Sequence, residues 1–273
     1  MLCAVIHWAN PSRVSMLDAM NGVTGIASGR QKLARAWHHI NDLERMISEY
    51  QEENKVEVRV YLSPSIEYDN EIDCEVAAIS VSDAPDDWAL ITGDALTNLR
   101  AALDRAVYPH AEHFPILLSN TNSKGAEICV EEIFDAVTTV IILRHQPFHD
   151  PLPAHHPLGL LRKLDTRDRH CRLRVTNQFR PELIFPSSND YEVIDTPGPT
   201  VHELVPGAVF KHFRLRLRPG FTQSQLTYSN RLAATVVMNV PDTNDDVPLV
   251  ASMRSIHTRV SEILDQLEAI GIM

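Results

Sequence analysis

Apolar residues recur every three or four positions in several long stretches of the chain, which is the spacing of one face of an amphipathic helix. Within residues 29–51 these positions are Leu33, Trp37, Ile40, Leu43 and Ile47. The same spacing predicts helices over 88–108, 158–170 and 250–270, of which 88–108 carries the strongest pattern. Residues 126–144 also show helical spacing, although β-branched residues are abundant there.

Other stretches alternate apolar and polar residues, as strands do. KVEVRVYL at 55–62 and EIDCEVAAISV at 71–81 predict a β-hairpin, and further strands are predicted within 171–179, 208–218 and 231–240. We therefore expect an α+β fold: a helical bundle with an inserted β-hairpin, and a C-terminal β-rich segment closed by a helix. The expected domains are a poorly structured segment 1–25, a bundle 26–170 with the hairpin at 55–81, and a β-rich part 171–273 whose helix packs back on the bundle.

Composition narrows the class of protein. The 273 residues are 44% hydrophobic and 22% charged, and no apolar run approaches the length that crosses a bilayer. The first residues lack the features of a signal peptide, and the four cysteines form no C-x-x-C pair. A cytoplasmic protein without a membrane partner is the prediction.

The formal net charge of −11 disfavours non-specific binding of nucleic acid. Basic residues are nevertheless concentrated in 162–180 and in HFRLRLR at 212–218. Because Arg214, Arg216 and Arg218 alternate with apolar residues, the solvent face of a strand is favoured over an anion site there.

Polar residues border the apolar face of the helix predicted at 88–108. Projection at 100° per residue places Asp94, Asn98 and Arg105 on one edge, and Arg100 with Asp104, an i,i+4 pair, on the opposite flank. Charged groups beside a core form either salt bridges or a site, and salt bridges are the commoner explanation.

The segment GDALTNLRAALDRAVY at 93–108 resembles a motif of uncharacterised bacterial proteins, in which Gly-Asp-Ala precedes spaced Asn, Arg and Ala-Leu-Asp. QPFH at 146–149 and HPLGLLRKLDTRDRHCRL at 156–173 resemble a Gln-Pro segment and a helix ending in Asp, a basic residue and His in the same proteins. In those relatives His often follows Ala-Leu-Asp, and an Arg with a His after four residues is similar to the signature of HEPN ribonucleases.

The resemblance to HEPN proteins implies a helical bundle that pairs as a dimer and cleaves RNA without a metal. In that chemistry the 2′-hydroxyl attacks, His handles protons and Arg steadies the phosphate. This chain departs from the pattern because Arg105 stands in the His position and cannot act as a general base. His110 or His170 could supply the missing group, and His170 is the preferred candidate because Asp165, Asp168 and Arg169 accompany it.

The leading hypothesis is an endoribonuclease, or a degenerate relative that binds RNA or an antitoxin-like partner, acting as a homodimer through helix 88–108 without a cofactor. The predicted catalytic residues are Arg100, Asp104, Arg105 and His170, and the predicted binding residues are Asp94, Asn98 and Arg169.

Two alternatives stay open. A histidine-rich stretch could bind zinc or another divalent metal for hydrolysis of a small ester, lactone or phosphate. The ligands would be His145, His149, His155, His156 and Asp165, whose spacing matches no known zinc signature. The other alternative is a non-catalytic, oligomeric interaction protein whose helix 88–108 belongs to the core.

Overall fold

The computed structural model describes residues 25–53, 57–64, 70–80, 83–108, 110–120, 130–171, 173–184, 191–195, 202–203, 209–220, 229–243 and 245–271. The chain divides into two compact units. Met1–Glu44, Asp86–Arg174 and Met238–Met273 form the helical unit, and Arg45–Pro85 and Val175–Val237 form the strand unit. The α+β fold predicted from the sequence is confirmed. Except for Gly25, the segment 1–25 lies outside the described residues.

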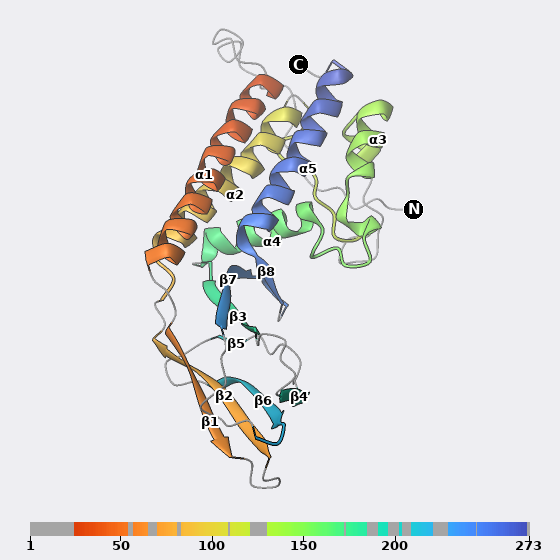
Figure 1. Cartoon of the computed structure of the whole chain (residues 1–273). Helices are drawn as coiled ribbons and strands as arrows, with labels where there is room; N and C mark the ends of the chain where they lie inside the picture. The colour runs from red at the N-terminus through yellow and green to blue at the C-terminus, as the bar shows by residue number, and fades with distance from the viewer. Residues whose placement is uncertain are drawn as a thin grey trace. The chain divides into compact units, whose positions relative to one another are not determined.

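The helices follow the predicted periodicity closely. Their bounds are α1 Gly25–Glu53, α2 Asp87–Val107, α3 Ala136–Arg144, α4 Pro157–His170 and α5 Leu249–Ala269. Figure 1 shows α1, α2 and α5 running side by side, with α4 crossing near one end of them. Two 3-10 turns, Val130–Glu132 and Pro147–His149, flank α3.

The α-helix predicted over 126–144 begins later in the structure than predicted. Asp135 caps α3 by accepting hydrogen bonds from Val137 N at 2.9 Å and Thr138 N at 3.1 Å, so the helix begins at Ala136. The hydrogen bond from the Thr138 hydroxyl, followed by that from its backbone N–H, holds the pKa of Asp135 below its ordinary value. Residues 121–129 lie outside the described part of the chain.

Helix α2 lies at the centre of the helical unit. Leu96, Leu99 and Leu103 are fully buried, as are the small residues Ala95 and Ala102. Helix α1 packs closely on α2, since a Cβ added to Gly29 would lie 2.8 Å from the carbonyl oxygen of Ala102. Small residues thus allow neighbouring backbones to approach, and the core forms around α2.

The strands form two sheets. Their bounds are β1 Glu57–Pro64, β2 Glu71–Ser80, β3 Val175–Ile184, β4 Tyr191–Asp195, β5 His202–Glu203, β6 Val209–Leu217, β7 Ser229–Asn239 and β8 Asp246–Pro248. One sheet has the order β1-β2-β6-β4 and the other β5-β3-β7-β8. The predicted hairpin is confirmed, with Tyr61 opposite Glu75. Its second strand also pairs antiparallel with β6, so the hairpin joins a sheet with the later strands.

The arginines of β6 are paired with acidic residues of β2. Arg214 binds Asp73 at 3.1 Å, and Arg216 binds Glu71 at 3.0 Å. Glu71 is only 3% exposed, so these arginines neutralise a buried carboxylate. Arg214 and Arg216 therefore lie on a strand face, as predicted, and both are paired with carboxylates.

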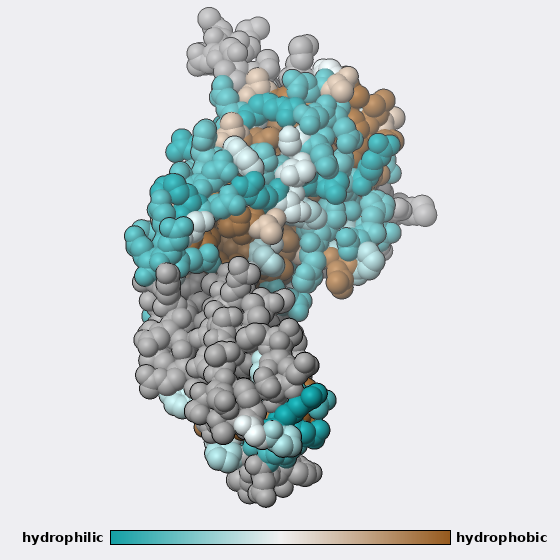
Figure 2. All heavy atoms as spheres, viewed as in Figure 1, coloured by the Kyte–Doolittle hydropathy of each residue, from teal (hydrophilic) through white to brown (hydrophobic). Residues whose placement is uncertain are grey.

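Hydrophilic side chains cover most of the helical unit on the face that Figure 2 shows, with hydrophobic side chains collected in a few places. One of these places coincides with α3, where Val137 and Val140 are exposed. None of the described helices combines the length and the apolar character needed to cross a bilayer.

Gly93 of α2 lies directly against Asp168 of α4. A Cβ at position 93 would lie 2.5 Å from Oδ2 and 2.6 Å from Oδ1 of Asp168, which is closer than such atoms approach in proteins. Burial, followed by the charges of Asp165 and Asp94, raises the pKa of Asp168 above its ordinary value. A side chain at position 93 would therefore displace the Asp168 carboxylate.

We expect Gly93→Ala to lower the free energy of unfolding by about 1 kcal/mol, because the overpacking penalty of about 1–3 kcal/mol exceeds the helix-propensity gain of about 1 kcal/mol. In an Asp168→Ala background the same substitution should be neutral or stabilising, since the clash is gone. Urea unfolding of the four proteins measures both effects. An equal effect of Gly93→Ala in the two backgrounds would contradict this account.

Candidate functional site

The segment 113–117 follows α2. Its backbone groups are bound by side chains and not by a neighbouring strand. Asp104 of α2 accepts a hydrogen bond from Phe114 N through Oδ1 at 2.8 Å. Arg100, one turn earlier, donates to the Phe114 carbonyl at 2.9 Å. The pair that the helical projection places on one flank of α2 thus fixes both polar backbone groups of one residue.

Two further side chains hold the rest of this segment. Gln146, which is 1% exposed, accepts from Leu117 N at 2.7 Å and donates to the Pro115 carbonyl at 3.0 Å. Arg162 of α4 donates to the Ile116 carbonyl at 2.6 Å. Since buried backbone groups must find partners, these bonds fix the path of the segment.

That path brings His113 against Asp104. His113 Nδ1 lies 3.2 Å from Asp104 Oδ2, and Arg100 binds the same carboxylate, with Nε 3.3 Å from Oδ2 and a terminal nitrogen 3.1 Å from Oδ1. The Arg100 and Asp104 side chains are 18% and 20% exposed, whereas His113 is 57% exposed. The result is an Arg–Asp–His cluster in which the imidazole is the most exposed group.

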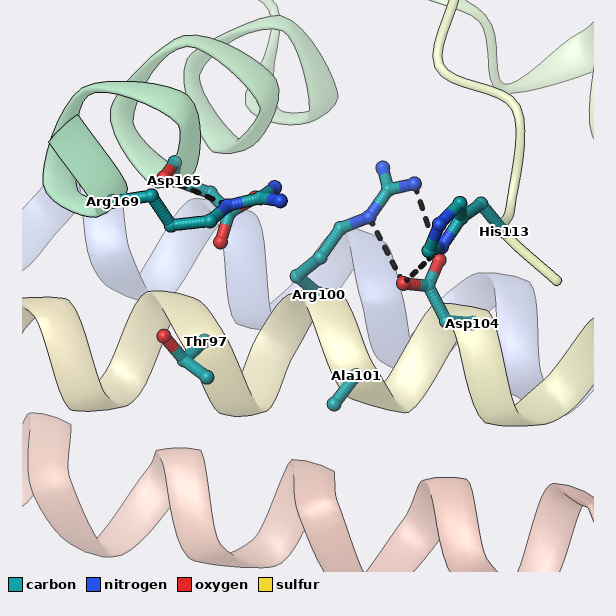
Figure 3. A pocket seen from close by; sticks show the side chains of 7 residues that line it. All are labelled: Thr97, Arg100, Ala101, Asp104, His113, Asp165 and Arg169. Carbon is teal, nitrogen blue, oxygen red and sulfur yellow. Dashed lines mark hydrogen bonds and ion pairs between the residues drawn. The ribbon is translucent and has the colours of Figure 1, made fainter.

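The cluster forms one wall of a pocket of about 330 Å³. The pocket is lined by Thr97, Arg100, Ala101, Asp104, His113, Asp165 and Arg169. Figure 3 shows the guanidinium of Arg169 reaching from α4 toward Arg100, with Thr97 and Ala101 below them on α2. Arg169 binds the Asp165 carboxylate, and its side chain is 62% exposed. The pocket therefore presents guanidinium groups from two helices beside one histidine.

Positive charges lie close together behind this pocket. Burial, followed by the nearby charge of Arg100, lowers the pKa of Arg162 below its ordinary value, although an arginine stays charged at any physiological pH. Asp104 and Asp165 offset part of this charge. A guanidinium carries five N–H donors, so Arg100 and Arg169 retain donors for an anion after binding their carboxylates.

The structure brings together three of the predicted site residues, Arg100, Asp104 and Arg169, and adds Asp165 from the alternative set. Arg105 lines a neighbouring pocket. His170 ends α4 and is exposed, and it is not among the lining residues of either pocket.

Asn98 and Asp94 lie elsewhere on α2. Asn98 is buried, donates to the Asp94 carbonyl at 2.7 Å and accepts from Lys32 of α1 at 3.4 Å. Asp94 lies near Asp168, whose pKa its charge raises. Neither residue lines the pocket, and Asn98 bridges helices α1 and α2.

His113 is the residue that sequence reasoning did not select. The stretch PHAEH follows α2 immediately, and its last residue becomes part of the cluster. The sequence feature that could have identified His113 is its position a few residues after a helix that carries an Arg–Asp pair on one flank. The bonds to Gln146 and Arg162 that decide its position come from remote parts of the chain.

The histidines of the alternative metal site each have a separate partner. His149 Nε2 lies 3.0 Å from the Leu143 carbonyl, His155 Nε2 lies 3.0 Å from Asp245, and His156 caps α4 by accepting from Leu158 N. Within the described ranges no three His, Cys, Asp or Glu side chains are grouped to hold a metal ion. The arrangement gives the zinc hypothesis no support, and it stays a prediction.

His145 is buried, with 4% of its surface exposed. Arg259 of α5 donates to its Nδ1 at 3.1 Å, which places the proton of the neutral ring on Nε2. Burial is the first cause that lowers the pKa of His145, and it likewise lowers the pKa of His156 and His257. Folding therefore favours the neutral form of these rings.

Protonation should destabilise the fold as the pH falls. A folded-state pKa below the unfolded value of about 6.5 means that the unfolded chain binds more protons, so stability rises with pH below that value. We expect the free energy of unfolding to decrease between about pH 7 and about pH 5.5, and His145→Asn to reduce this slope. Urea unfolding across the range measures it, with His149→Asn at an exposed histidine as control. A slope unchanged in His145→Asn would contradict the assignment.

Comparisons with protein-family models, with curated proteins and with solved structures find no match for this chain. The chemistry of the pocket is therefore inferred from its own residues.

Proposed function

We propose that the protein is a ribonuclease that cleaves RNA without a metal ion, at the pocket formed by Arg100, Asp104, His113 and Arg169. The contact that carries the proposal is that of His113 with Asp104, in a pocket that also holds two guanidinium groups. It supplies an oriented proton acceptor beside groups that bind phosphate, which are the two requirements of this reaction.

Asp104 orients the imidazole of His113. A carboxylate accepts hydrogen bonds, so the ring donates its Nδ1–H to Oδ2 and keeps the lone pair on Nε2. Because the His113 side chain is 57% exposed, this lone pair can reach a bound substrate. The carboxylate also stabilises the ring once it is protonated.

The proposed reaction uses the 2′-hydroxyl of RNA as the nucleophile. His113 Nε2 removes the hydroxyl proton, the O2′–P bond forms, and the P–O5′ bond breaks. The departing 5′-oxygen takes a proton from water, which gives a 2′,3′-cyclic phosphate and a 5′-hydroxyl end. Arg100 and Arg169 stabilise the charge that develops on the phosphate oxygens.

The proposal keeps the metal-independent chemistry that the resemblance to HEPN ribonucleases implies and assigns the proton transfer to His113 in place of His170. Pairing of two chains through α2 stays a prediction. A partner RNA is supported by the guanidinium groups of the pocket, whereas the net charge of −11 restricts binding to such local sites.

We expect His113→Ala to slow cleavage of a fluorescent RNA by about 10²–10⁴-fold, the usual contribution of a general base. Its unfolding midpoint should stay close to that of the unaltered protein, since the side chain is exposed. His170→Ala is the matched control at another exposed histidine and should retain activity. Cleavage should be unaffected by EDTA and should leave 2′,3′-cyclic phosphate ends, identified by mass spectrometry.

Four results would contradict the proposal. Full activity of His113→Ala would show that His113 is not the general base. Loss of activity in His170→Ala would assign that role to His170. Cleavage abolished by EDTA would favour the metal-assisted hydrolase. RNA binding without cleavage would identify the degenerate, binding-only relative.

A further inference from the structure

We propose that a second pocket beside the first binds a guanine base of the RNA, an inference that rests on the proposed function. This pocket has a volume of about 320 Å³, within the range of small-molecule sites. It is lined by Ala101, Asp104, Arg105, Tyr108 and Glu112. Ala101 and Asp104 also line the first pocket, so the two are contiguous along α2.

Apart from Asp104, the polar side chains of the second pocket have no hydrogen-bond or ion-pair partner in the part of the chain that the structure describes. Arg100 and Asp104 bind each other and the segment 113–117. Arg105, Tyr108 and Glu112 make no side-chain hydrogen bond or ion pair with any residue that the structure describes, and all three are exposed. Their hydrogen-bonding capacity is therefore available to a ligand.

Tyr108 offers an aromatic face at the end of α2. The residue is 53% exposed, which leaves much of it open to contact. Single-stranded RNA is recognised largely by stacking of its unpaired bases on such rings, and a nearby guanidinium adds cation–π attraction. The phosphate that Arg100 and Arg169 are proposed to hold would lie in the adjoining pocket.

The charges beside Tyr108 select guanine among the four bases. Guanine presents two neighbouring acceptors, O6 and N7, which match the donors of an arginine. Its Watson–Crick edge presents two neighbouring donors, N1–H and N2–H, which match the two oxygens of a carboxylate. Arg105 and Glu112 supply one group of each kind, whereas adenine, cytosine and uracil lack one or both of these pairs.

The test measures binding separately from cleavage. Fluorescein-labelled 2′-O-methyl tetranucleotides cannot undergo attack by the 2′-oxygen, so their anisotropy reports binding alone. Four such probes carry G, A, C or U at one position between uridines. We expect the G probe to bind the full-length protein about tenfold more tightly than the others, in line with the contribution of one good base contact.

Variants locate the preference. Tyr108→Ala should weaken binding of the G probe about tenfold, as loss of a stacking ring does, and Glu112→Gln should abolish the preference for G over A. Tyr61→Ala and Glu131→Gln are matched controls at an exposed tyrosine and an exposed glutamate outside both pockets, and they should bind as the unaltered protein does.

Equal binding of the four probes, absence of binding by all of them, or a G preference that survives in both Tyr108→Ala and Glu112→Gln would overturn the inference. Cleavage of unmodified RNA without a base preference would overturn it and leave the proposed function intact. A guanine preference that maps to Tyr108 and Glu112, in a protein that cleaves no RNA, would support the base site and refute the ribonuclease proposal.

Discussion

The helical unit depends on the burial of one helix, α2, on most of its sides. Ala95, Ala102 and Ala106 are fully buried, and they let neighbouring helices approach its backbone. Gly29 of α1 lies against the α2 backbone at Ala102, and Asp168 of α4 lies against Gly93 of α2. The side chains that α2 leaves accessible, among them Thr97, Arg105 and Tyr108, are consequently confined to a narrow stripe, and both pockets lie along it.

The carboxylate of Asp104 contributes both to the fold and to the candidate site. Its Oδ1 anchors the backbone of Phe114, and its Oδ2 contacts the imidazole of His113. The same segment is held from other directions by Gln146 and Arg162. Residues of the Gly-Asp-Ala and Gln-Pro motifs therefore hold the segment 113–117 in place. The position of His113 is a consequence of these bonds.

Much of the fold could be predicted because helices and hairpins are encoded by local patterns. The periodicity of Leu33, Trp37 and Ile40 identifies α1, and alternation identifies β1 and β2. The pairing of β2 with β6 could not be predicted, since it joins residues such as Glu71 and Arg216 that lie far apart in the sequence. For the same reason Arg100 and Asp104 could be selected from helical spacing, whereas the placement of His113 requires side-chain bonds from three separate segments.

The division of the chain also has a consequence for its synthesis. The helical unit is assembled from three stretches of sequence and the strand unit from two, so the chain passes between the units four times. During translation α2 emerges long before α5, which supplies Leu264 and other apolar residues to the same core. The edge of β2 that pairs with β6 likewise stays unpaired until β6 has been translated. The nascent chain therefore carries an uncovered apolar helix and an unpaired strand edge, the surfaces that chaperones bind, and neither unit can fold completely until its last segment has been translated.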